Sequence, residues 1–295
     1  MPAYRFCRTD DIGLLVDALN RCWAPYFPDE PAMTPAAFKR SIRDLQVWCS
    51  SCMVAFAGSD PIGVLIGAKR ARGTLVHKIA IHPAHRRQGH GRHLLTSLGS
   101  KLAILGPPRI IAEVPEAFAA GSGLFSACGY VQEALLTDYV LQREENPSTR
   151  AEFPRSLRAG DNDGRLVIPI TVDDLVANGL LEENHLQVCW ERSVETLTAR
   201  KDEIAGLAVA SDERIEAYLL YVECEAGAEI VSLRSFIEDR GVRLTQLLSQ
   251  LRARGIGTLR FPKVRPAEIS KECLETLGFR PAGVHLLYAA TARSE

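Results

Sequence analysis

A short run of basic and glycine residues has the composition of an anion-binding loop. Arg86, Arg87 and Arg92 surround Gly89 and Gly91 in the sequence RRQGHGR. Glycine has no Cβ, so its backbone can approach a phosphate group closely, and guanidinium groups form charge-assisted hydrogen bonds with phosphate oxygens. These residue types at this spacing predict a binding site for a phosphate or pyrophosphate group.

The elements on either side place this loop at the amino end of a helix. Residues 75–81 predict a short apolar strand, which Pro83 ends. Leucines at helical spacing then predict a helix that begins near Gly89 to Gly91 and ends near Gly106. The first N–H groups of a helix have no intrahelical partner, and the helix dipole adds partial positive charge there. The alternative is an ordinary basic surface loop before a core helix.

In this context the segment resembles the GNAT superfamily of acyl-CoA N-acyltransferases. The family signature is Arg or Gln, two residues, Gly, one residue, then Gly or Ala, and Arg86, Gly89 and Gly91 match it. The resemblance implies that acetyl-CoA is the co-substrate, with its pyrophosphate on the loop and its pantetheine arm between the strands at 75–81 and 109–114. It assigns coenzyme binding to Ile79, Ala80, Ile81, Arg86, Arg87, Gln88, Gly89, His90, Gly91 and Arg92.

Acetyl transfer to an amine needs a positioned thioester, a deprotonated amine and a donor for the developing oxyanion. The resemblance implies that a backbone N–H between Ile79 and Ile81 meets the oxyanion. His77 shares strand parity with these residues and can accept a proton near neutral pH. Glu113, on the neighbouring strand, is the carboxylate candidate for the base, and Glu116 lies just beyond it. For each of them the alternative is a side chain without a catalytic role.

Two positions depart from the family pattern. The tyrosine that often protonates the departing thiolate corresponds to Phe125, and the asparagine that often holds pantetheine corresponds to Phe118. Ser126 or water can act as the acid instead, because a thiolate is a good leaving group. Both departures favour an alternative function, namely a catalytically inactive acyl-CoA-binding or sensing module whose second domain docks a partner.

The predicted elements of residues 1–143 follow the order β-α-α-β-β-β-α-β-α-β-β, with two final strands ending at Gln142. This is the order of a GNAT fold, an α/β (α+β) arrangement in which helices flank a mixed, mostly antiparallel twisted sheet. Trp23, Tyr26 and Phe27 end the first helix, where they are either acceptor contacts or plain packing. Residues 144–165 are polar, contain Pro and Gly, and predict a linker.

Residues 166–295 repeat the first half of the chain. TVDDL at 171–175 matches RTDDI at 8–12, and ECLETLGF at 272–279 matches GLFSACGY at 123–130. We therefore expect two tandem GNAT folds. In the second copy the loop reads SFIEDRGVRL, where Glu238 and Asp239 replace the arginines and Gly241 is retained. Carboxylates repel a pyrophosphate, so this copy is expected to be degenerate and not to bind the coenzyme.

Composition and charge exclude several other classes of protein. The net charge of −1 over 295 residues argues against a general binder of nucleic acids or membrane surfaces. Residues 1–143 contain 16 Lys and Arg against 11 Asp and Glu, whereas the remainder contains 19 against 25. The half with the glycine-rich loop thus has the better field for a polyanionic coenzyme.

The remaining expectations concern location, metals and partners. The sequence shows neither a signal peptide nor an apolar run of membrane-spanning length, and its eight cysteines are scattered, so we expect reduced thiols in a cytoplasmic protein. Five of the seven histidines lie between positions 77 and 93, but they span a strand, a loop and a helix, and no metal is expected. The expected partner is a small-molecule or peptide amine acceptor, and the protein is a monomer or a homodimer.

Overall fold

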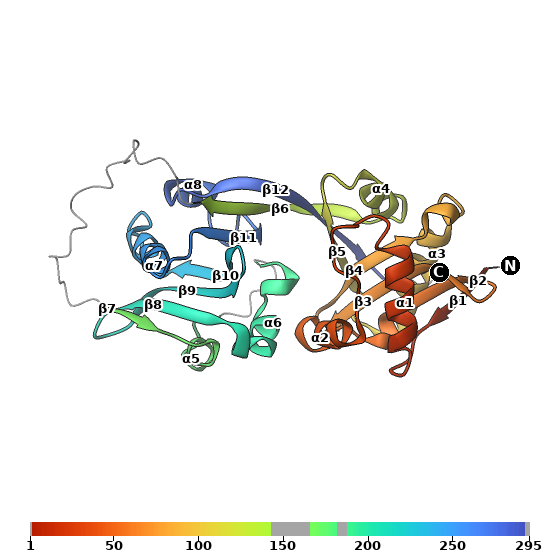
Figure 1. Ribbon diagram of the computed structural model, residues 1–295, viewed down its shortest axis with the longest axis horizontal. Coiled ribbons are helices and arrows are strands. Elements are labelled where there is room, and N and C mark those ends of the chain that lie inside the picture. Colours follow the sequence, from red (N-terminus) through yellow and green to blue (C-terminus); the bar gives the residue numbers. More distant parts are fainter. Residues whose placement is uncertain (1, 143–165, 182–187, 293–295) are drawn as a thin grey trace. The chain divides into compact units, whose positions relative to one another are not determined.

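The structure of the chain, a computed structural model, describes residues 2–142, 166–181 and 188–292. The chain divides into two compact units. Unit 1 comprises Met1–Leu135 and His285–Glu295, and unit 2 comprises Leu136–Val284. Each unit is a sheet with helices packed against it (Figure 1). None of the helices in the described ranges is long and apolar enough to cross a membrane.

Unit 1 contains the predicted strand, loop and helix near the middle of its sheet. The neighbouring strands follow the order β1-β2-β3-β4-β5-β12, and all pairs are antiparallel except β4 with β5. The elements are β1 (Pro2–Phe6), α1 (Ile12–Cys22), α2 (Pro35–Leu45), η1 (Cys49–Ser51), β2 (Met53–Ala57), β3 (Asp60–Arg70), β4 (Gly73–Ile81), η2 (Pro83–His85), α3 (His90–Leu105), β5 (Arg109–Pro115), α4 (Ala119–Ala127) and β12 (Arg280–Thr291).

Local sequence signals account for the helices of unit 1. The Thr34 hydroxyl caps α2 by accepting a hydrogen bond from the Ala37 N–H at 3.1 Å, and Pro35 occupies the first helical position. Four leucines of α3, at positions 94, 95, 98 and 102, are buried against the sheet in one apolar cluster. This buried face fixes the axis of α3, and its amino end therefore has a defined place beside the end of β4.

Unit 2 has the same plan. Its strands follow the order β7-β8-β9-β10-β11-β6, and again only one pair, β10 with β11, is parallel. The elements are β6 (Val131–Gln142), β7 (Leu166–Pro169), α5 (Val172–Ala177), η4 (Trp190–Arg192), α6 (Val194–Ala199), η5 (Lys201–Glu203), β8 (Ala205–Ala210), β9 (Ile215–Cys224), β10 (Gly227–Ser235), α7 (Val242–Ala253), β11 (Thr258–Val264) and α8 (Lys271–Thr276). The tandem α/β fold expected from the internal repeat is confirmed.

The last strand of each sheet comes from the other half of the sequence. Residues 285–291 of β12 pair with β5 in unit 1, and residues 137–142 of β6 pair with β11 in unit 2. The compact units therefore differ from the expected boundaries at 1–143 and 166–295, and the expected linker at 144–165 lies outside the described residues. The expectation of two strands before Gln142 is wrong, because residues 131–142 contain no Gly, Pro or Asn to form a turn and make one strand of 12 residues.

Candidate functional site

The two parallel strands of unit 1 pair only where they begin. Among the described residues, the ladder between β4 and β5 consists of Thr74 with Ile110 and Leu75 with Ile111. Val76 and the residues 78–81 of β4 pair with β3. We call the stretch where residues 77–81 of β4 and residues 112–115 of β5 are not paired with each other in this described ladder the slot. The family resemblance predicts that the pantetheine arm lies between these strands.

Backbone groups of β4 point into the slot at alternate residues. The His82 N–H donates to the Ile62 carbonyl on β3 at 2.9 Å. Residues of an antiparallel strand direct their N–H and C=O groups alternately to one neighbour and the other, so Ile79 and Ile81 direct theirs away from β3 and toward β5. These are two of the residues expected to contact the coenzyme.

The loop that follows β4 leads directly to the amino end of α3. Gly89 precedes the helix with φ of +86°, a conformation that residues with a Cβ rarely adopt, and no described side chain caps α3. Gly91 lies in the first turn, where a Cβ would come within 3.1 Å of the Leu124 side chain on α4. The turn before α3 therefore favours glycine at position 89, and the close packing of α3 against α4 favours glycine at position 91.

The arginines of the loop differ in their surroundings. Arg86 and Arg87 are exposed, and the Arg86 guanidinium carbon lies 5.6 Å from the ring centre of Tyr26. Gln88 is also exposed. Arg92 reaches along α4 and donates to the Ala127 carbonyl at 3.3 Å. Arg92 is thus tied to the end of α4, whereas the exposed Arg86 lies beside the Tyr26 ring.

His90 is expected at the coenzyme, but its ring points into unit 1. It is buried, and its Nδ1 lies 2.7 Å from the hydroxyl of Tyr4 on β1. Burial, with a smaller effect from His85 and His93, lowers the pKa of His90. The Tyr4 ring also lies 3.7 Å from the His93 ring, measured between centres. His90 can therefore offer an anion its backbone N–H, whereas its neutral ring connects α3 to β1.

The two candidate bases lie on the strands that border the slot. The ladder with β3 skips His77, because Gly67 pairs with Val76 and Ile66 with Lys78. Alternation along a strand is interrupted at a bulge, so strand parity does not assign the His77 side chain to either face of the sheet, and its role as a base stays a prediction. Glu113 alternates with Ala112 and Val114, which pack in the core beneath α3, so its side chain leaves the opposite face of the sheet. Glu116 is exposed.

The residues considered for protonating the departing thiolate, Phe125 and Ser126, lie in the second half of α4. Phe125 is only 2% exposed and packs against the rings of Tyr130 and Tyr288, so it belongs to the core. Ser126 is exposed, whereas the Ser122 hydroxyl is buried and has no hydrogen-bond partner among the described residues. Sequence reasoning missed Ser122, because no pattern of residues distinguishes it from the other small residues of this helix.

Aromatic side chains from the segment after α1 and from the residue before α4 contact one another. Tyr26 and Phe27 both contact Phe118, at 6.2 and 5.9 Å between ring centres. The Tyr26 hydroxyl donates to the Ile81 carbonyl at 2.6 Å. The sequence placed these aromatic residues near the acceptor side but gave no sign of this hydrogen bond.

A lysine on β4 was also missed. Lys78 lies with its ammonium group 3.9 Å from the Trp23 ring centre and 3.1 Å from a Glu30 oxygen. The Trp23 indole N–H donates to the same oxygen at 2.9 Å. Trp23, Glu30 and Lys78 therefore form one connected group on the side of β4 that faces away from α3.

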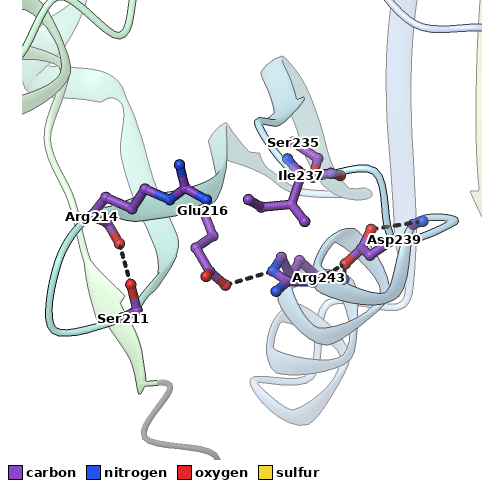
Figure 2. Close-up of polar contacts among 8 residues, drawn as sticks. Ser211, Arg214, Glu216, Ser235, Ile237, Asp239 and Arg243 are labelled. Atoms are coloured by element: carbon purple, nitrogen blue, oxygen red, sulfur yellow. Dashed lines mark hydrogen bonds and ion pairs between the residues drawn. The ribbon is translucent and has the colours of Figure 1, made fainter.

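In unit 2 the corresponding loop places a carboxylate, that of Asp239, at the amino end of α7. Asp239 accepts hydrogen bonds from the Gly241 N–H at 3.0 Å and from the Arg243 N–H at 2.9 Å (Figure 2). The Arg243 guanidinium lies between Asp239, at 2.7 Å, and Glu216, at 2.6 Å. Burial opposes ionisation of Asp239, but the hydrogen bonds from Arg243 and Gly241 outweigh it and lower its pKa.

The glycines before the two helices share a backbone conformation, and the loops differ in the side chains around the helix ends. Gly241 precedes α7 with φ of +82°, close to the +86° of Gly89 before α3. A carboxylate occupies the first N–H groups of α7, whereas α3 has no side-chain cap among the described residues. At α7 the Asp239 carboxylate thus occupies N–H groups that a bound anion would need, whereas at α3 no side chain of the described residues does so.

Comparisons with known proteins support the family resemblance. Residues 48–132 match the family described as an acetyltransferase (GNAT) domain. The chain is similar to a GCN5-related N-acetyltransferase from Sphaerobacter thermophilus, at 14% identity with a TM-score of 0.67, over 99% of this chain and 96% of that chain. It is similar to a tandem GNAT protein from the clavulanic acid biosynthesis pathway, at 16% identity with a TM-score of 0.64, over 100% of both chains.

A third solved structure, a GCN5-related N-acetyltransferase from Kribbella flavida, has a TM-score of 0.62 at 12% identity, over 99% of this chain and 71% of that chain. At these identities the similarity establishes the fold. No curated protein sequence matches the chain.

Proposed function

Because this chain carries a GNAT acetyltransferase domain at residues 48–132 and has a tandem GNAT fold, we propose that it is an N-acetyltransferase. Acetyl-CoA supplies the activated thioester, and the acceptor is a primary amine of a small molecule or peptide. Unit 1 binds the coenzyme and carries the reaction. Unit 2 is the degenerate copy.

In this proposal the coenzyme is held by groups already in position. The N–H groups of the first turn of α3, with Arg86 and Arg87, hold the pyrophosphate. Gly89 permits close approach of the backbone. The backbone groups of Ile79 and Ile81 face the pantetheine arm in the slot. The field of residues 1–143, which have an excess of basic residues, favours a polyanion.

The reaction is a direct attack by the amine on the thioester. The amine nitrogen bonds to the carbonyl carbon, the carbon–sulfur bond breaks, and the sulfur leaves as a thiolate. His77 or Glu113 takes the proton that the amine loses, directly or through water. A backbone N–H of residues 79–81 donates to the oxygen on which negative charge develops. Most of the rate then comes from positioning, because the thioester is already activated.

One observation carries the assignment of the coenzyme to unit 1. Within the described part of the chain, no side chain caps the amino end of α3, whereas Asp239 caps that of α7. A bound pyrophosphate satisfies the first N–H groups of α3 and interacts favourably with the helix dipole. In unit 2 a pyrophosphate has to displace an ionised carboxylate that is held by three hydrogen bonds.

The test is a calorimetric titration of acetyl-CoA into the wild-type chain and the double variant Arg86→Glu/Gly89→Glu. We expect one site per chain, and none in the variant. Arg240→Glu, at the exposed equivalent loop of unit 2, is the matched control and should bind as the wild type does. Two sites, or one site that survives the double substitution, would contradict the assignment.

Turnover separates catalysis from binding alone. Release of free thiol is measured with acetyl-CoA and a panel of amines that covers polyamines, aminoglycosides, amino acids and peptide amino termini. We expect an acceptor-dependent rate that the Arg86→Glu/Gly89→Glu variant loses. Phe125, which stands where the family often has the tyrosine that protonates the thiolate and which is buried, favours the alternative of a catalytically inactive acyl-CoA-binding or sensing module. One-site binding without turnover for any acceptor would support that alternative.

A further inference from the structure

The hydroxyl of Tyr26 is hydrogen bonded to a backbone group of the slot. Tyr26 follows α1, and its hydroxyl donates to the Ile81 carbonyl at 2.6 Å in a partly buried position. Ile81 is the last residue of β4. Burial raises the pKa of Tyr26, so its hydroxyl is a donor throughout the physiological pH range.

The Ile81 carbonyl faces β5, not β3. The neighbouring residue His82 donates its N–H to Ile62 on β3, and Ala80 pairs with Val64 on the same strand. By alternation the carbonyl of Ile81 points to the other side, into the slot where β4 and β5 are no longer paired. The Tyr26 hydroxyl therefore donates to a carbonyl group that faces the slot.

The Tyr26 ring also contacts the two other walls of the coenzyme site. It lies edge-on to Phe118, the residue that precedes α4, with 6.2 Å between ring centres. On another side the Arg86 guanidinium carbon lies 5.6 Å from its centre. One side chain thus contacts the end of β4, the anion-binding loop and the start of α4. A residue that only packed α1 onto the sheet would not need a hydrogen bond inside the slot.

We propose that Tyr26 is a positioning residue that occupies the Ile81 carbonyl until an amide N–H of the pantetheine arm replaces its hydroxyl. This inference rests on the proposed function, since it requires coenzyme A in the slot of unit 1. A partly buried carbonyl needs a hydrogen-bond partner, and the hydroxyl supplies one while the slot holds no arm. Entry of the arm exchanges one donor for another, and the Tyr26 side chain then moves toward Arg86 and the acceptor side.

The test compares two ligands that differ only in the arm. Coenzyme A and adenosine 3′-phosphate 5′-diphosphate, which lacks pantetheine, are titrated into the wild-type chain and Tyr26→Phe. The substitution keeps the ring against Phe118 and Arg86. It removes the hydroxyl that competes with the pantetheine arm, so the Ile81 carbonyl loses this hydrogen-bond donor. We expect coenzyme A to bind about two- to tenfold more tightly, the range of one hydrogen bond, and the affinity for the armless ligand to be unchanged.

The control variant is Tyr218→Phe, which removes a tyrosine hydroxyl that lies 3.2 Å from Ser232 in unit 2. It should change neither affinity. Unchanged or weaker binding of coenzyme A to Tyr26→Phe, or an equal change for both ligands, would overturn the inference while leaving the proposed function intact. Failure of the wild-type chain to bind either ligand would overturn the proposed function, and the inference with it.

Discussion

At the scale of single residues, the differences between the two copies are chemical and local. Gly89 and Gly241 have nearly the same backbone conformation, yet the residues beside them decide whether the helix end is open to an anion. Asp239 lies two residues before Gly241, and its carboxylate accepts hydrogen bonds from the N–H groups of Gly241 and Arg243. Arg87, at the equivalent position in unit 1, is exposed. One carboxylate in place of a guanidinium therefore changes the charge and the occupancy of the helix end.

The first prediction concerns Asp239→Ala. The variant loses a capping carboxylate and leaves Arg243 with one of its two partners, so the free energy of unfolding should fall by about 1–2 kcal/mol. Urea denaturation followed by circular dichroism measures the change. The exposed Glu238→Ala is the matched control and should differ little from the wild type. Equal stability of the two variants would show that the cap contributes nothing.

The pH dependence of stability provides a second prediction for the same residue. The pKa of Asp239 is lowered in the folded state, so its ionised form stabilises the fold above the unfolded value of about 3.9. That stabilisation is lost as the pH falls through the folded pKa. Between pH 6 and pH 3 the wild-type chain should lose more stability than Asp239→Asn, as measured by urea denaturation at each pH. Parallel curves would contradict the shift.

The third prediction tests whether Phe125 belongs to the core or faces the slot. Phe125→Tyr places a hydroxyl among the rings of Tyr130 and Tyr288, all three of which are buried. We expect a loss of about 1–3 kcal/mol in unfolding free energy and no gain in turnover. Phe118→Tyr, at a half-buried ring, is the control. A stable and faster Phe125→Tyr enzyme would place this side chain at the departing thiolate.

At the scale of elements, the site follows from how two strands and two helices are packed. The buried leucine face of α3 holds that helix against the sheet, and Gly91 lets it approach α4 closely. The slot exists because the parallel ladder of β4 and β5 stops after two residue pairs. The bulge at His77 lies on the same strand, β4, whose residues 79 and 81 direct their backbone groups toward β5.

The fourth prediction concerns the packing of α3 against α4. In Gly91→Val the added side chain starts at a Cβ position only 3.1 Å from Leu124, and its two methyl groups extend farther into the same contact. We expect α4 to be displaced and the affinity for acetyl-CoA to fall at least tenfold, because the first turn of α3 holds the pyrophosphate in our proposal. Calorimetry measures the affinity. Gly99→Val, in α3 at a site with no neighbour within 4 Å, is the control.

At the scale of the whole molecule, the chain exchanges strands between its two units. β5 pairs with residues near the carboxyl end of the chain, and β11 pairs with residues that follow α4. A unit cut at the boundary suggested by the repeat therefore lacks a strand of its own sheet. This arrangement ties the folding of each unit to the presence of the other half of the sequence.

The fifth prediction is that the fragment 1–143 does not fold as unit 1 does. Without residues 285–291, one edge of β5 has no partner, and Tyr288 is missing from the cluster around Phe125. We expect poor amide dispersion in NMR spectra and no cooperative thermal transition, in contrast to the full chain. A folded fragment would mean that residues 131–142 have taken the place of β12 beside β5.

The sequence by itself determined most of the elements and the place of the glycine-rich loop before α3. The glycine and arginine spacing, the leucine period of α3 and the Thr34 cap are local patterns, and the structure places these elements where the patterns predict them. The internal repeat likewise predicted two copies of one fold. Local patterns suffice here because helix ends, turns and amphipathic faces depend on residues close together in the chain.

Only the tertiary structure decided what depends on residues far apart in the chain. The hydrogen bond from Tyr26 to Ile81 joins residues 55 positions apart, and β12 meets β5 across more than half of the chain. A bulge interrupts the strand's alternation at His77, and burial assigned Phe125 to the core. No local pattern encodes such contacts, because they arise when sheet registers and helix packing are satisfied together.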